Sequence, residues 1–84
     1  HADTHRRMGD CFIREGKMEQ AEAMYRKAIG SNPYPDAVLY FLWGRTLEDT
    51  GQKQSAVAAF QTAARIDPTN QSIQIKLRQL GIVP

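Results

Sequence analysis

One short pattern occurs twice in this chain, and the two copies lie thirty-five residues apart. Small residues and a proline recur at that distance, and both copies carry an aromatic residue at the same place. The matching pairs are Gly9 and Gly44, Gly16 and Gly51, Ala21 and Ala56, Ala23 and Ala58, Tyr25 and Phe60, Ala28 and Ala63, and Pro33 and Pro68. An internal repeat of this period is typical of stacked helical pairs. The sequence therefore predicts a helical array, which points to a binding scaffold and away from an enzyme.

Length and charge limit the classes of partner that the chain can bind. The chain has 84 residues, so it forms one domain at most, and its stability must come from contacts between the repeats. Eleven basic and nine acidic side chains give a formal charge of +2, and the two signs are interspersed. Such a surface has no sustained field for a polyanion or an acidic membrane, so we expect neither nucleic acid nor membrane as a partner. The longest apolar run, residues 38–43, is far shorter than the roughly 20 residues of a membrane span.

The ends and the single cysteine say little about where the protein works. The chain does not begin with Met, which we interpret as the mark of an excised fragment or a processed product. Cys11 is the only cysteine, so no internal disulfide can form. This excludes a disulfide-stapled secreted fold and leaves the compartment open, although it favours the cytoplasm.

Apolar residues recur at helical spacing rather than strand spacing, and glycine or proline separates the runs. The pattern predicts five helices, at about residues 3–15, 18–31, 36–50, 53–66 and 71–80. Gly16 follows the first of them, at the position of a left-handed C-terminal cap. The third helix is apolar around most of its circumference, so we expect it at the centre of the fold. The fifth has one apolar and one polar face, which is typical of a capping helix.

Taken together, these residues closely resemble the tetratricopeptide repeat family. The first copy of the motif consists of Met8-Gly9, Phe12, Gly16, Ala21, Tyr25, Ala28 and Pro33, and the second of Trp43-Gly44, Leu47, Gly51, Ala56, Phe60, Ala63 and Pro68. The resemblance implies one all-α domain over residues 1–84, an α-solenoid of two helix hairpins at about residues 2–35 and 37–70 with a capping helix at about 71–80. The small residues let neighbouring helices approach closely, and we expect Tyr25 and Phe60 to fill the volume left between pairs.

Two features depart from the family's pattern. The spacing of thirty-five residues, where the family has thirty-four, implies one extra residue in the junction at residues 33–36. His5 and Tyr40 stand where tryptophan is commonest. Related arrays that read RNA are the alternative. Pentatricopeptide repeats have the period of thirty-five residues, and Trp43, Leu47 and Glu48 resemble residues of half-a-tetratricopeptide repeats. The seven-residue distance from Gly9 to Gly16 favours the tetratricopeptide pattern, and an RNA-related array stays as the alternative.

Catalytic and cofactor motifs are not apparent in the sequence. Gly16-Lys17 is a helix end rather than a phosphate loop, and we expect no cofactor. His1 and His5 lie one helical turn apart at a terminus, which we interpret as a solvated end rather than a metal site. Cys11 has no base supplied by any sequence pattern, so we expect a small packed residue rather than a nucleophile.

In this family the first helix of each pair lines the concave face, and the resemblance implies that a partner binds there. Helical spacing places eight candidate binding residues on that face: Arg6, Asp10, Ile13, Val38, Phe41, Arg45, Glu48 and Ile75, with Asp3, Ser72 and Gln79 beside them. Val38 and Phe41 have two interpretations. They either complete the core against the fifth helix or form the apolar floor of a peptide site with charged walls.

We therefore expect a scaffold that holds an extended or helical segment of a partner protein in its concave groove. The alternatives are RNA binding, which would weaken steeply with salt, and a structural or self-associating segment of a longer solenoid, which would show in the solution mass. Family members that grip the acidic carboxyl end of heat-shock chaperones use a clamp of Lys or Arg with Asn. The matching positions here are Arg6, Asp10, Leu42, Ser72 and Lys76, of which only the first and last fit, so we expect no tight binding of that tail.

Overall fold

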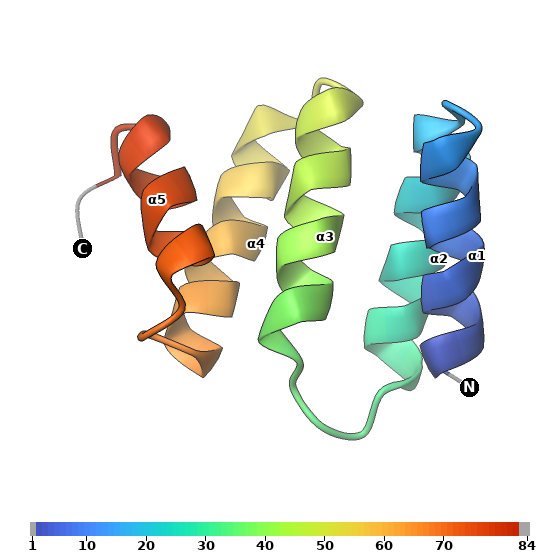
Figure 1. Cartoon of the computed structure of the whole chain (residues 1–84), viewed down its shortest axis with the longest axis horizontal. Helices are drawn as coiled ribbons and strands as arrows, with labels where there is room; N and C mark the ends of the chain where they lie inside the picture. Colours follow the sequence, from blue (N-terminus) through green and yellow to red (C-terminus); the bar gives the residue numbers. More distant parts are fainter. Residues whose placement is uncertain (1, 83–84) are drawn as a thin grey trace.

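The computed structural model describes residues 2–82, which form five α-helices joined by short connections (Figure 1). The helices are α1 (Ala2–Arg14), α2 (Met18–Ser31), α3 (Ala37–Asp49), α4 (Lys53–Ile66) and α5 (Gln71–Gln79). The predicted all-α fold with five helices is confirmed, and these five account for all the regular secondary structure of residues 2–82. Helices α1, α3 and α5 lie in one layer, and α2 and α4 lie behind them (Figure 1). None of the described helices is long and apolar enough to cross a membrane.

Glycine ends the first helix of each pair in the same way. Gly16 and Gly51 have φ angles of 76° and 81°, a left-handed conformation in which a side chain would be strained. The backbone N–H that follows each glycine closes the turn, because Lys17 donates to the Phe12 carbonyl at 2.8 Å and the same bond recurs thirty-five residues later. This arrangement is the Schellman motif. The predicted cap at Gly16 is confirmed, and the two copies of the pattern form the same turn.

Side-chain caps set the starts of α3 and α5. The Asp36 carboxylate accepts hydrogen bonds from the backbone N–H groups of Val38 at 3.0 Å and Leu39 at 3.2 Å. Asn70 accepts one from Ile73 at 3.2 Å. Each cap satisfies N–H groups that have no partner within the helix. Helix α3 therefore begins one residue later than expected, because Asp36 caps the helix instead of joining its first turn.

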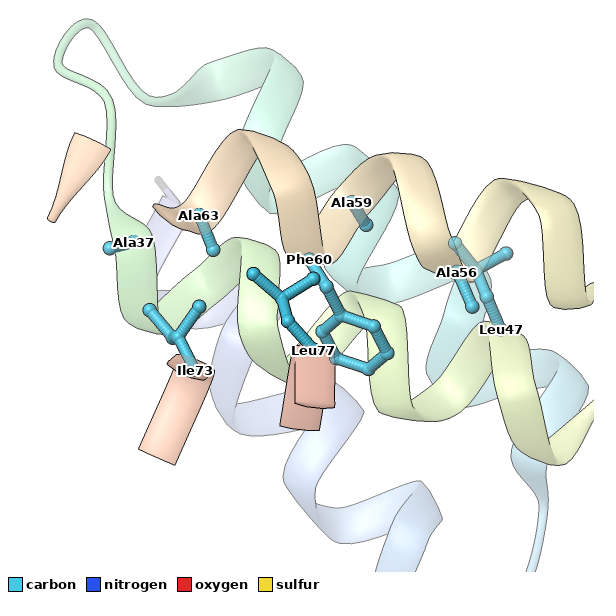
Figure 2. Close-up of a cluster of buried hydrophobic side chains, with 8 residues drawn as sticks. All are labelled: Ala37, Leu47, Ala56, Ala59, Phe60, Ala63, Ile73 and Leu77. Carbon is cyan, nitrogen blue, oxygen red and sulfur yellow. The ribbon is translucent and has the colours of Figure 1, made fainter. Parts of the chain in front are cut away.

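Two buried clusters form the core, and α3 contributes to both. The cluster around Phe60 consists of Ala37, Leu47, Ala56, Ala59, Phe60, Ala63, Ile73 and Leu77 (Figure 2). The cluster around Tyr25 consists of Ala21, Tyr25, Ala28 and Leu39. Trp43 packs against both clusters, and its indole N–H donates to the Glu22 carboxylate of α2 at 2.8 Å. The prediction that the third helix is central is confirmed.

The aromatic residues of the two copies pack in the clusters that join each pair to the helix after it, as we expected, and each also lies against the first helix of its own pair. A Cβ atom added to Gly9 would lie 2.8 Å from the Tyr25 ring, and one added to Gly44 would lie 2.7 Å from the Phe60 ring. Real Cβ atoms do not approach a carbon so closely. Glycine is therefore required because each ring lies directly on the backbone of the facing helix.

The expectation that Cys11 is packed is wrong. Its side chain is exposed, and the Arg14 guanidinium donates to its sulfur at 3.1 Å. Met8, one turn earlier, is 43% exposed. Both lie on a face of α1 that no other helix of residues 2–82 covers, and α1 and α2 lie on the opposite side of the structure from α5 (Figure 1).

Candidate partner-binding groove

A groove runs between α1 and α3, with Tyr25 of α2 beneath it. We call it the α1–α3 groove, and its lining residues are Asp10, Ile13, Arg14, Tyr25, Leu42, Arg45, Thr46 and Asp49. Half-buried Ile13 and Leu42 supply apolar surface from facing helices. Two acids and two arginines surround them. The fold thus brings together three of the predicted site residues, Asp10, Ile13 and Arg45, in one groove with an apolar floor and charged walls.

The Tyr25 hydroxyl holds Asp10 at this groove. It donates a hydrogen bond to the Asp10 carboxylate from a side chain that is almost completely buried. Burial raises the pKa of the Tyr25 hydroxyl well above its ordinary value, and the hydrogen bond and negative charge of Asp10 raise it further. Arg6 and Arg45 act in the opposite direction through their positive charges. Asp10 is therefore fixed by a neutral donor from α2, in the second layer (Figure 1).

The predicted residues of α3 continue from this groove towards α5. The Arg45 guanidinium lies 6.0 Å from the centre of the Phe41 ring, so this arginine borders both parts of the surface. Phe41 is half-buried against the Phe60 ring, with the ring centres 5.5 Å apart. Farther along α3, Glu48 forms an ion pair with Lys76 of α5 at 2.8 Å. Phe41, Arg45 and Glu48 thus form one continuous strip.

Three predicted residues lie away from the α1–α3 groove. Arg6 lines a separate hollow at the other end of α1, together with Asp3, Asn32, Asp36 and Leu39. Val38 is 45% exposed and lies by the α2–α3 connection and the end of α4. Ile75 is 50% exposed on α5. The eight predicted residues therefore do not converge on one pocket.

Sequence reasoning missed five residues that line the groove. The sequence pattern predicts Tyr25 as a packed residue and Leu42 as a clamp position that does not fit, and it assigns no role to Arg14, Thr46 or Asp49. The missed signal is that a residue at the edge of the packed stripe borders the neighbouring helix, so it contributes to the floor of a groove as well as to the core. Thr46 shows this directly, since it is buried and its hydroxyl donates to the Leu42 carbonyl at 2.9 Å.

The described residues hold no cluster of three or more His, Cys, Asp or Glu side chains that could ligate a metal ion. His1, which lies one helical turn from His5 in the predicted first helix, is outside the described residues. The groove presents charged, hydroxyl and apolar groups that can hydrogen-bond and pack against a bound segment.

Comparison with known proteins places the chain in a family. Two family models described as tetratricopeptide repeat match it, one over residues 2–35 and the other over residues 37–70. The photosystem I assembly protein Ycf3 of Synechococcus sp. (strain CC9605) is 32% identical to the chain over 71 residues. That match covers 77% of this chain and 41% of the relative, so the chain spans less than half of the relative's length. The chain belongs to the tetratricopeptide repeat family, whose members are typically non-enzymatic scaffolds for protein interaction.

Proposed function

We propose that the chain holds an extended or helical segment of a partner protein in the α1–α3 groove. The observation that carries this proposal is the combination of apolar surface from Ile13 and Leu42 with charged groups on both walls. An apolar side chain of the partner gains free energy by leaving water there, and the surrounding polar groups fix its direction.

Arg45 is the residue that we expect to orient the segment. Its side chain is exposed, borders the groove and reaches over the Phe41 ring, so its N–H groups can donate to a carboxylate or a backbone carbonyl of the partner. Asp10 is already held by Tyr25, which keeps the carboxylate in place as an acceptor for an N–H or ammonium group. A segment with an apolar residue between groups of opposite charge would match these walls.

The matched relative supports a role in assembly in general terms. Its name describes a protein that assists the assembly of photosystem I, and a scaffold that holds protein segments is suited to such a task. The chain spans only part of that relative, so we propose the general activity, the holding of a protein segment, and not its partner.

An acidic carboxyl-terminal tail is a poor match for the same surface. Asp10 would repel its carboxylates, and the ammonium group of Lys76 is already paired with Glu48 at 2.8 Å. Leu42 offers no hydrogen bond where the chaperone-binding members have a polar clamp residue. We therefore expect no tight binding of a Glu-Glu-Val-Asp peptide, and a low-micromolar dissociation constant in isothermal titration would contradict this.

A peptide selected from a random phage-displayed library provides a test that needs no knowledge of the natural partner. Its affinity would be measured by titration against the wild-type chain and two variants, Arg45→Ala and Phe41→Glu. We expect Arg45→Ala to weaken binding by about 1–2 kcal/mol and Phe41→Glu to remove it. Arg65→Ala is the matched control, because Arg65 is exposed on α4 in the second layer.

Amide chemical shifts on peptide addition decide which face is used. We expect the shifts to gather on α1 and α3. Shifts confined to α2 and α4, or an Arg45→Ala variant that binds as tightly as Arg65→Ala, would refute the groove. A melt of Phe41→Glu is needed as well, because the contact of Phe41 with Phe60 makes it part of the core. If Phe41→Glu unfolds, the affinity of the Arg45→Ala variant still decides whether the peptide binds in the groove.

A further inference from the structure

The outer side of α1 carries a second surface, which is separate from the α1–α3 groove. Its seven lining residues all come from α1: Asp3, Thr4, Arg7, Met8, Cys11, Phe12 and Glu15. Thr4, Met8, Cys11 and Glu15 follow one another at intervals of four, three and four residues, so they form a single stripe along the helix. We call it the α1 outer stripe. Its centre, Met8 with Cys11 and half-buried Phe12, is apolar and accessible.

The internal repeat shows how the equivalent face of α3 is covered. The residues thirty-five positions later than Thr4, Met8, Cys11 and Phe12 are Leu39, Trp43, Thr46 and Leu47 of α3. In α3 these residues are buried or half-buried, and Leu39 and Trp43 pack on the cluster that α2 supplies. The same stretch of helix is thus covered by a neighbouring helix in α3 and uncovered in α1.

The composition of the stripe favours a reversible contact. Arg7 stands where α3 has Leu42, and Asp3 stands where α3 has Val38. Charged side chains at such positions tolerate water, whereas a permanently buried helix face would leave them desolvated. An interface that forms and dissociates has this mixture of an apolar centre and a charged rim.

The charges are also arranged symmetrically about Cys11. Arg7 lies four residues before it and Glu15 four residues after it, so both stand on the same stripe with opposite signs. When two α1 helices pack antiparallel with Cys11 facing Cys11 of a second copy, Arg7 of each copy meets Glu15 of the other. Their present partners hold them only weakly, because the Arg7–Asp3 and Glu15–Lys17 pairs are at least half exposed.

We propose that two copies of this chain associate through the α1 outer stripe, antiparallel and related by a two-fold axis that passes near Cys11. The interface is self-complementary, as a two-fold contact must be, since the apolar centre meets itself and each basic end meets an acidic end. Asp10 and Ile13 lie off the stripe, in the α1–α3 groove, so association leaves these groove residues free.

Charge reversal tests the arrangement. The dissociation constant of the dimer would be measured by sedimentation equilibrium for the wild type, Arg7→Glu, Glu15→Arg and the double variant. Each single reversal places like charges opposite each other twice, so we expect about a tenfold or larger weakening. The double reversal restores opposite charges and should return the constant to about the wild-type value. Arg65→Glu, an exposed reversal on α4, is the control and should change nothing.

Crosslinking through the Cys11 thiol tests separately whether the two α1 helices meet at this residue. A short bismaleimide alkylates one Cys11 thiol at each end and needs no oxidant, and Cys11 is the only cysteine of the chain. We expect a covalent dimer on a denaturing gel for the wild type and the double variant, and a marked loss of it for either single reversal. A chain that stays monomeric at millimolar concentration overturns the proposal. A dissociation constant that the single reversals leave unchanged, or that the double reversal does not restore, also overturns it.

Discussion

Gly44 and Phe60 form a contact in which glycine is needed for its lack of a side chain. The Phe60 ring lies where a Cβ atom of residue 44 would stand, at 2.7 Å. We expect Gly44→Leu to overpack this contact and to lower the free energy of unfolding by about 1–3 kcal/mol. Circular dichroism melts of the variant and the wild type measure the difference. An unchanged midpoint would mean that the two helices do not meet in this register.

Gly30 is the matched control for that substitution. It also lies in a helix, but a Cβ atom added there would have nothing within 4 Å. Leucine favours helix more than glycine does, so we expect Gly30→Leu to stabilise the chain by about 0.5–1 kcal/mol. Opposite signs for the two glycines would separate the effect of the ring contact from the effect of helix propensity.

Tyr25 links the core to the groove through its hydroxyl, and this link is sensitive to pH. Because burial and Asp10 raise the pKa of Tyr25 in the folded chain, the folded state keeps a proton that the unfolded state releases above about pH 10. The neutral phenol's contribution to stability is thus fully present below pH 10 and declines as pH rises above it. We expect Tyr25→Phe to abolish this part of the alkaline loss in urea titrations at several pH values. Tyr34→Phe should retain it, since Tyr34 is 77% exposed.

At the scale of the element, the two glycine caps offer a comparison within one molecule. Gly16 and Gly51 have nearly the same positive φ, and open space surrounds both. We expect Gly16→Ala and Gly51→Ala each to cost about 1 kcal/mol, because alanine is strained in the left-handed region while no new contact is made. Denaturant melts measure both variants. A cost at one position only would show that the turns differ in a way that their equal geometry does not suggest.

The helices could be predicted from the sequence because their ends are encoded locally. Gly16 and Gly51 end helices because glycine can adopt a positive φ angle. Pro33 cannot continue a helix because it has no backbone N–H to donate. The groove could be predicted only in part. The bond from Tyr25 to Asp10 joins residues on two helices, and the exposure of Cys11 depends on which faces of α1 the other helices of residues 2–82 cover. Periodicity locates a packed stripe, but it does not tell whether another helix covers that stripe.

At the scale of the whole molecule, α3 couples the two clusters. Leu39 belongs to the cluster around Tyr25 and Leu47 to the cluster around Phe60, and Trp43 packs against both. A repeat array can in principle unfold one pair at a time, because each pair contacts only its neighbours. Here the same helix supplies buried side chains to both clusters, so neither can lose its packing without exposing part of α3. We therefore infer that the chain unfolds as one unit.

Ile73→Ala tests this cooperativity from the far end of the array. Ile73 is buried against the cluster around Phe60, and its truncation should cost about 2–5 kcal/mol. We expect the Trp43 fluorescence and the far-ultraviolet circular dichroism to shift together in urea, with amide exchange faster in α1 and α2 as well. Ile75→Ala on the same helix is the control, since Ile75 is half exposed and should change stability little. Two separate transitions, or unchanged exchange in α1 and α2, would mean that the pairs unfold independently and that α3 does not couple them.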